Sequence, residues 1–283
     1  MLPRLSSNVY FENRCASGGF TAYVLSANPA ARGVGVTLPT EEGGHPWMLS
    51  SDIDNRFQLI WHNLLSYDLG PASRRTLLGH DPFPFFSRTF NLILLDGHRL
   101  RTQVETEFAR GSEHERLLLG QFQIGLRCVM DGGTIVMKLS KVEDELTARV
   151  LVMLDKIANE LYVHKPTSTH RNRASCYAIA KGVRCNETLN GYVAALQELW
   201  YEMTYGGREG RGTSIPQEQM LEGLVPFDEL TEETNLDRLT ALGTGAWKIQ
   251  LDALRMQHQK YEHSRRPPGV PGIRGQRPER SHA

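Results

Sequence analysis

A lysine and an aspartate, each placed directly after an apolar run, are the residues of this chain best suited to chemistry. Lys138 follows Gly132–Met137, a Gly-Gly turn with four apolar or β-branched residues, and Asp96 follows Asn91–Leu95. Lysine is seldom buried unless something uses it. A lysine can take up a proton when desolvation or a nearby positive charge lowers its pKa, and a carboxylate can orient it. The pair therefore predicts a proton-transfer site.

Both residues must lie at the same edge of a sheet to form such a site. A short apolar run between turn signals is typical of a buried strand in a parallel sheet, and open α/β sheets bind ligands at the carboxyl ends of their strands. By its position alone, Lys138 could equally extend its amine to solvent at the sheet rim. Asp96, at the equivalent end of a second run, favours the shared site.

The rest of the chain supplies the elements of an α/β fold. Apolar runs predict seven strands, at residues 9–15, 33–38, 57–61, 91–96, 132–139, 161–164 and 176–180. Helical patterns are present at residues 20–27, 112–126 and 140–157. The last two strands have no helix between them, which indicates an antiparallel strand. We therefore expect a doubly wound, seven-stranded, Rossmann-like sheet that is mostly parallel with one antiparallel strand.

The sequence beyond this domain is predicted to be helical and then disordered. We expect an α/β domain over 1–184, a helical extension with a Gly/Arg-rich linker over 185–263, and a disordered basic tail over 264–283. A Phe/Pro cluster at 83–86 could stack nucleic-acid bases, but we favour packing within its own segment.

Composition limits which binding partners and which cellular location we expect. The 283 residues contain 32 Lys and Arg and 32 Asp and Glu, so a nucleic-acid site must be a local patch rather than an overall field. The four cysteines form no C-x-x-C pair, which favours free thiols and an intracellular location, cytoplasmic or nuclear. No apolar run of membrane-spanning length is present, so we expect no membrane partner. The ten histidines show no metal spacing, so we expect no metal, and the oligomeric state stays open.

Five motifs resemble those of the FtsJ/RrmJ-like ribose 2′-O-methyltransferases. The first, Cys15–Phe20 (CASGGF), resembles the family's CAxPGGF-type motif, with Arg14 and Ser17 in place of a small residue and the proline. The other four follow in the family's order: Gly33–Pro39, Leu94–His98, Gly132–Leu139 and Lys165–Val183. The stretch Leu38–Pro46 (LPTEEGGHP) is similar to that of the fungal FtsJ-like group. The resemblance covers residues 9–183.

The resemblance implies an S-adenosylmethionine-dependent enzyme that methylates the 2′-hydroxyl of an RNA ribose. Lys138 matches the family's central lysine, which removes the hydroxyl proton, and Asp96 matches its motif-four aspartate, which also borders the cofactor. The implied cofactor-binding residues are Ser17, Gly18, Gly19 and Phe20 on the methionine side, Thr37 at the ribose position and Asn63 at the adenine position.

Two members of the family's Lys-Asp-Lys-Glu tetrad have no counterpart in this chain. The first lysine lies upstream of the Gly motif, where the chain has Met1–Asn8 without lysine, and the glutamate position corresponds to Ser175. We therefore expect an N-terminally truncated or degenerate member, in which Arg4 or Arg171 could supply the missing charge. A noncatalytic S-adenosylmethionine- or RNA-binding protein is the alternative. A nicotinamide oxidoreductase is a third reading, without the G-x-G-x-x-G fingerprint.

The segment 165–173, before the last predicted strand, is basic and polar. Lys165, Arg171 and Arg173 could contact RNA phosphates, which position a nucleic acid without reading its sequence. A solvated loop accounts for these three residues equally well. We interpret three histidines as loop or rim residues: His45, His98 and His170.

Overall fold

The computed structural model describes residues 8–49, 55–74, 80–98, 113–168, 170–207, 212 and 218–265. Three features of the sequence analysis lie outside these residues: Arg4, the helix start expected at Ser112, and the tail beyond residue 265.

A seven-stranded sheet forms the centre of the molecule, in the order β3-β2-β1-β6-β7-β9-β8. Its strands are β1 Val9–Asn13, β2 Arg32–Thr37, β3 Phe57–Trp61, β6 Phe90–Leu95, β7 Val129–Ser140, β8 Glu160–His164 and β9 Ser175–Val183. β9 runs antiparallel to both neighbours, whereas the other pairs are parallel. The predicted doubly wound, mostly parallel sheet is therefore confirmed.

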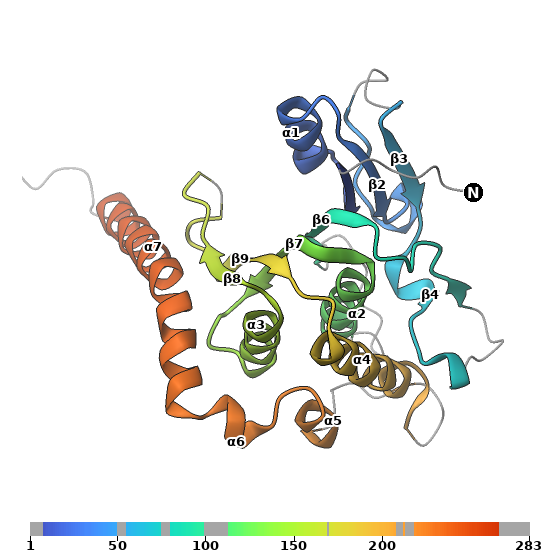
Figure 1. Ribbon diagram of the computed structural model, residues 1–283. Helices are drawn as coiled ribbons and strands as arrows, with labels where there is room; N and C mark the ends of the chain where they lie inside the picture. Colours follow the sequence, from blue (N-terminus) through green and yellow to red (C-terminus); the bar gives the residue numbers. More distant parts are fainter. Residues whose placement is uncertain are drawn as a thin grey trace, which may run out of the picture.

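Helices cover both faces of the sheet (Figure 1). α1 Gly19–Ala27 lies on one face, and α2 Glu113–Cys128, α3 Glu145–Ile157 and α4 Glu187–Tyr205 lie on the other. β1 shows why both faces are covered: Tyr10 packs with Leu25 of α1, whereas Val9 and Phe11 face the larger cluster on the other side. Alternation along a strand sends neighbouring side chains to opposite faces, so a strand that is buried throughout needs a covering layer on each face.

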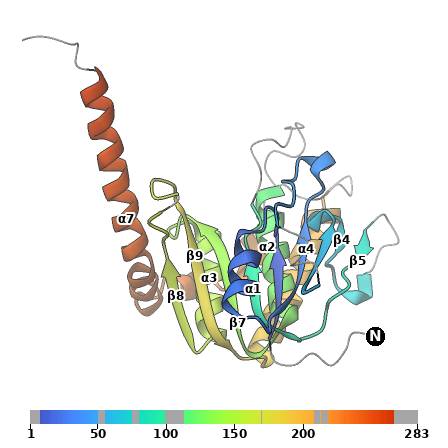
Figure 2. The same ribbon diagram turned by 90° about the horizontal axis from the view of Figure 1, so that it is seen from above.

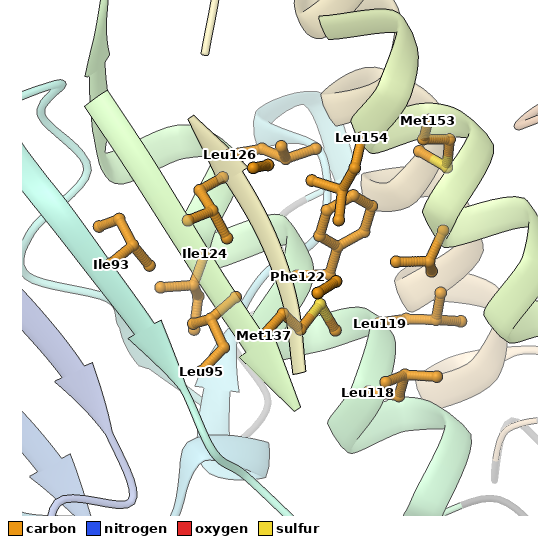
Figure 3. Packing of buried hydrophobic residues seen from close by; sticks show 14 of the residues in the cluster. Ile93, Leu95, Leu118, Leu119, Phe122, Ile124, Leu126, Met137, Met153 and Leu154 are labelled. Carbon is orange, nitrogen blue, oxygen red and sulfur yellow. The ribbon is translucent and has the colours of Figure 1, made fainter. Parts of the chain in front are cut away.

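The larger core lies between the sheet and α2, α3 and α4. Figure 3 shows Ile93 and Leu95 of β6 and Met137 of β7 against Phe122 of α2 and Leu154 of α3. Each is 1% exposed or less, and burying a side chain of this size stabilises the fold by about 1.5–3 kcal/mol. The strands that end at the two candidate residues are thus among the most firmly packed elements.

The Phe/Pro segment also belongs to this core. Phe83 and Phe85 are buried, and their rings contact each other edge to face. Packing, the favoured interpretation, is confirmed over base stacking. Nearby lie the short strands β4 Tyr67–Asp68 and β5 Asp81–Pro82 and the 3-10 turns η3 Leu64–Ser66 and η4 Ala72–Arg74; η1 Thr40–Glu42 follows β2.

The C-terminal helices complete the core. They are α5 Glu218–Glu222, α6 Phe227–Leu230 and α7 Glu233–Arg265. Trp200 of α4 is 1% exposed, and Val225, between α5 and α6, is fully buried. The fully buried guanidinium of Arg149 on α3 donates to the carbonyl oxygens of Leu221 and Val225 and pairs with Glu145 and Glu222. A contiguous core and this buried cation therefore connect the sheet to the segment beyond it.

α7 runs past β8 at the edge of the sheet and then projects from the domain (Figure 2). Among the helices described here, none has the length and apolar character that a membrane crossing requires.

Candidate active site

The carboxyl ends of three adjacent strands carry the candidate site. In the parallel register, Asn13 of β1 pairs with Leu95 of β6, which pairs with Met137 of β7. The next residues along β6 and β7 are Asp96 and Lys138, and Lys138 Nζ lies 3.2 Å from Asp96 Oδ1. Their side chains are 17% and 12% exposed. The predicted meeting of the two side chains is present, and the solvent-directed alternative for Lys138 is not what the structure shows.

Arg14 brings a second cation to Asp96 from the end of β1. Its Nη1 lies 3.6 Å from Asp96 Oδ2, while its backbone N–H donates to Val36 O at 2.7 Å. Burial lowers the pKa of the guanidinium, and the charge of Asp96 opposes this shift. The sequence analysis placed the extra charge at Arg4 or Arg171. Because the predicted strand 9–15 contained Arg14, the sequence pattern did not mark it as a strand-end residue, whereas β1 in the structure ends at Asn13.

Tyr177 completes the group around Asp96. It lies opposite Lys138 in the antiparallel β7–β9 pairing, and its hydroxyl donates to Asp96 Oδ1 at 2.9 Å. Burial and the nearby carboxylate raise the pKa of the phenol, so it remains a hydrogen-bond donor. Ser175 instead pairs with Ser140, farther along β7. The side chain next to the lysine–aspartate pair is therefore Tyr177, which the sequence analysis did not single out.

His98 lies in the loop after β6, as expected, but its half-buried ring is part of the cluster around Asp96 rather than exposed at the rim. Its ring nitrogens are 2.7 and 2.9 Å from Arg14 Nη1, and its Nδ1 is 3.1 Å from Lys138 Nζ. Burial and the two cations lower the pKa of the imidazole to about 4. His98 is therefore neutral at neutral pH and adds no third positive charge.

A buried glutamine fixes the backbone beside the cluster. Gln121 of α2 is fully buried. Its Oε1 accepts from the Gly97 N–H at 2.9 Å and from Asn13 Nδ2 at 3.1 Å, and its Nε2 donates to Gly97 O at 3.0 Å. A buried amide with its polar atoms satisfied holds its partners firmly. Gly97 and the adjacent His98 are thereby held in place.

Gly97 and His98 form a wall that two cavities share. The first cavity lies over the ends of β1, β2 and β3 and encloses about 720 Å³, counting its open mouth. The second, about 1630 Å³ on the same basis, is bordered by Lys138, Arg173 and Ser175. The site thus has two compartments on either side of one short backbone segment.

The expected cofactor residues divide between this cavity and the turn before α1. Thr37 and Asn63 line the first cavity, as do His45 and His62. Asn63 also accepts from the Leu65 N–H at 3.0 Å and donates to Glu42 Oε2 at 3.2 Å. Ser17, Gly18, Gly19 and Phe20 are not among the described residues that line it.

The turn before α1 requires a glycine at residue 18. Gly18 has φ +101°, a left-handed conformation that side chains rarely adopt. A Cβ there would lie 2.4 Å from Leu49 Cγ, so the side chain of Leu49 covers this turn. Gly19, by contrast, has open space where a Cβ would be. Phe20 reaches the other group of residues, because its ring contacts Tyr177 edge to face at 5.8 Å.

The three basic residues expected to contact RNA differ in exposure. Lys165 is 3% exposed, and its ammonium donates to the carbonyl oxygens of Arg173 and Ser175. It therefore holds the loop from inside. Arg171 and Arg173 are exposed, and Arg173 borders the second cavity together with His170. Within the described residues, no cluster of His, Cys, Asp or Glu could hold a metal ion.

A comparison with protein-family models identifies the family of the chain that carries this site. The model of the FtsJ-like methyltransferases matches residues 6–183. The chain belongs to the FtsJ-like methyltransferase family. That stretch contains the sheet, the described lining of the first cavity and every residue placed above around Asp96, whereas Leu221, which also borders the second cavity, lies beyond it. A comparison with curated protein sequences finds no match.

Solved structures similar to this FtsJ-like methyltransferase are distant. The "ribosomal RNA methyltransferase, putative" of Plasmodium falciparum has a TM-score of 0.42 and 12% identity, covering 64% of this chain and 88% of its own. Human methyltransferase-like protein 13 in complex with SAH has a TM-score of 0.39 and 13% identity, covering 70% and 83%. Spermidine synthase from Thermotoga maritima has a TM-score of 0.39 and 9% identity, covering 85% and 71%. Likenesses of this size carry no argument about the site.

FtsJ-like methyltransferases take S-adenosylmethionine as their methyl donor, and it is the cofactor of this chain. The first cavity fits such a group. Thr37 presents a hydroxyl and Asn63 an amide at the two positions that the family resemblance assigns to the ribose and the adenine, and both line the cavity. Its far wall is His98, beyond which lies Lys138.

Proposed function

We propose that this FtsJ-like methyltransferase methylates the 2′-hydroxyl of an RNA ribose, with Lys138 as the general base. One observation carries the proposal: Lys138 and Asp96 meet at 3.2 Å at the carboxyl edge of the sheet. Lys138 borders the second cavity, whereas Thr37 and Asn63 line the first, and Gly97 and His98 line both. When bound, S-adenosylmethionine supplies an electrophilic methyl group on a sulfonium.

Lys138 then accepts the proton of the attacking hydroxyl. To act as the base, the amine must present its lone pair, and Asp96 holds it in an ion pair beside the second cavity. Tyr177 fixes the carboxylate from the other strand. A positioned base of this kind contributes about 10²–10⁴-fold to a rate.

Arg14 supplies a second positive charge beside Asp96. Its guanidinium stays protonated in proteins, and it lies within 4 Å of the Asp96 carboxylate. Asp96 therefore keeps a cationic partner when Lys138 is neutral, and the buried carboxylate is never left alone. Arg173 borders the second cavity, and Arg171 lies in the same loop; both are exposed and support a polyanionic substrate.

Labelled methyl transfer to a panel of RNAs tests the proposal. Lys138→Ala should lower turnover about 10²–10⁴-fold, while calorimetry should give an S-adenosylmethionine Kd within about threefold of wild type, because the lysine lies beyond the wall of the first cavity. Lys138→Arg is the matched control, since it keeps the charge but cannot accept a proton. Wild-type turnover in either variant would refute the assigned role.

The position of the methyl group can be read from the product. Alkali cleaves RNA through the free 2′-hydroxyl, so a methylated ribose should retain its label in an alkali-resistant dinucleotide. Label in a mononucleotide would place the methyl on a base and overturn the ribose assignment.

A noncatalytic binding protein is the second candidate, and one observation favours it. Tyr177, a phenol whose pKa is raised by burial, stands beside the lysine, and Ser175, which the resemblance places at the glutamate position, pairs with Ser140 instead. Tight S-adenosylmethionine binding without turnover on any RNA would support this candidate against the first.

A further inference from the structure

The second half of α7 is the most exposed helical segment of the structure. Leu239, Leu242 and Ala246 of its first half are buried against the domain. Trp247, which follows them, is half-buried, and its indole donates to Glu143 Oε2 at 2.9 Å. From Lys248 to Glu262 the side chains are exposed or half-buried, and this part of α7 projects from the domain (Figure 2). It lies outside the family-matched residues 6–183.

Large side chains recur on one face of this segment. The intervals are four, three, four and three residues, and the residues are Trp247, Leu251, Leu254, His258 and Tyr261, which we call the α7 stripe. Leu251 is 47%, Leu254 44% and Tyr261 53% exposed. A single exposed leucine is ordinary, but alternating intervals of four and three are the spacing of a coiled-coil seam. The stripe therefore has the pattern of a helix that packs on another helix.

The other side of α7 already has a contact. Asn172, in the loop before β9, donates to Gln257 Oε1 at 2.9 Å. Ala253 and Lys260 border the same groove between α7 and this loop. At 100° per residue, Ala253 and Lys260 lie about 100–180° around the helix from Leu251 and Leu254, whereas Gln257 flanks the stripe at about 60° from Leu254. The loop thus leaves the stripe accessible.

Charges flanking the stripe favour one partner and one direction. Lys248, Arg255 and Glu262 lie seven residues apart on one flank. If a second stripe packs in the opposite direction, Lys248 of each copy faces Glu262 of the other, twice in one symmetric contact. Arg255 would face itself across the axis, with Asp252 at 4.0 Å to offset the charge. In a parallel pair this flank would instead face Gln250 and Gln257.

We propose that the α7 stripe is a docking surface for a second copy of this chain, with the two helices antiparallel. The exposed segment spans 15 residues, about 22 Å. It buries less than a standard interface, so the dimer is weak and depends on concentration. The inference is independent of the proposed methyl transfer, because it rests on no residue near Asp96.

Sedimentation equilibrium of the full chain, from low to high micromolar concentration, tests the proposal. Wild type should pass from monomer to dimer. Leu251→Gln with Leu254→Gln should remain monomeric over the same range, with unchanged circular dichroism and S-adenosylmethionine binding. Met256→Gln is the matched control, because Met256 is 49% exposed but lies off the stripe, and it should dimerise like wild type.

A charge exchange tests the direction. Lys248→Glu should weaken the dimer about tenfold by facing Glu262 of the second copy, and adding Glu262→Lys should restore it. A wild type that stays monomeric, or a dimer that survives both leucine substitutions, would overturn the proposal. So would a monomeric wild type whose RNA affinity falls with the leucine substitutions, since that would assign the stripe to RNA. Insensitivity of the dimer to both charge variants would overturn the antiparallel arrangement.

Discussion

The two sides of the site are built differently. Around Lys138, side-chain charges determine the geometry: Asp96 receives a lysine, an arginine and a tyrosine hydroxyl from three strands. On the cofactor side, backbone turns determine the geometry. Gly18 has a left-handed φ, and Asn63 caps the turn that follows β3. Substitutions on the first side should therefore act on turnover, and those on the second side on cofactor affinity.

Arg14→Ala should break the charged side most strongly. The substitution removes the cation that lies 3.6 Å from Asp96 Oδ2, so single-turnover methyl transfer should slow about 10–100-fold, which corresponds to about 1.4–2.8 kcal/mol. The S-adenosylmethionine Kd should stay within about threefold, and Arg14→Lys should recover part of the rate. Arg32→Ala, an exposed arginine at the start of β2, serves as control. Unchanged turnover in Arg14→Ala would remove this residue from the mechanism.

Asn63→Ala should break the cofactor side instead. The loss of a hydrogen bond to a neutral ligand group predicts a Kd for S-adenosylmethionine raised about tenfold, with turnover at saturating cofactor nearly unchanged. The matched control is Asn28→Ala, because Asn28 also accepts from a backbone N–H two residues on, that of Ala30, yet lies away from the cavity. Equal loss of affinity in both variants would mean that the amide acts only on the turn.

Tyr177→Phe should have a smaller effect on the charged side. It removes the 2.9 Å hydrogen bond to Asp96 but leaves both cations in place, so turnover should fall about fivefold without a change in cofactor affinity. Tyr162→Phe on β8, where the ring is 39% exposed, should have no effect. If Tyr177→Phe altered the Kd more than the turnover, the proposed division of the site would be wrong.

Among these variants, Glu12→Gln should change turnover least. Its main effect should be on how the stability of the cofactor side depends on pH. Glu12 accepts from Thr21 Oγ1 at 2.6 Å beneath the turn before α1, and burial raises the pKa of its carboxyl from 4.5 to about 8. Between pH 5 and 8 the folded state holds a proton that the unfolded state releases, so this group makes the protein less stable as pH rises through that window. Glutamine keeps the acceptor without the proton.

Thermal unfolding at pH 5, 6.5 and 8 measures this effect. Wild type should lose several degrees of Tm relative to Glu12→Gln as pH rises, and the two should converge near pH 5. A constant difference in Tm across the range would show that Glu12 does not titrate there.

The fold and one pair of site residues could be predicted from the sequence because they depend on local patterns. Apolar runs locate strands, and parallel strands bring their carboxyl ends to one edge, so Asp96 and Lys138 had to lie near each other once their strands were neighbours. The residue at the position of the family's glutamate was harder to predict. Ser175 and Tyr177 lie on the same face of β9, and which one faces Lys138 depends on the register, which shifts between Gly133 and Thr134.

Two other residues could not be placed from residue type. Arg14 has φ 62°, a conformation that arginine seldom adopts. The contacts of its side chain depend on this backbone conformation. Lys165 looked like a surface cation, but its ammonium satisfies two carbonyl oxygens inside its loop. In both cases the tertiary structure, not the local sequence, decides where the charge lies.

The buried guanidinium of Arg149 has a consequence for the limits of the folding unit. Its carbonyl acceptors belong to Leu221 and Val225, well past the end of the family-matched stretch. In a chain cut after Val183, the Arg149 guanidinium would lose these acceptors. The apolar surface around it would no longer be covered by Trp200 and its neighbours. We therefore expect such a fragment to aggregate, and a protease that cleaves beyond Val183 to inactivate the enzyme without touching its active site.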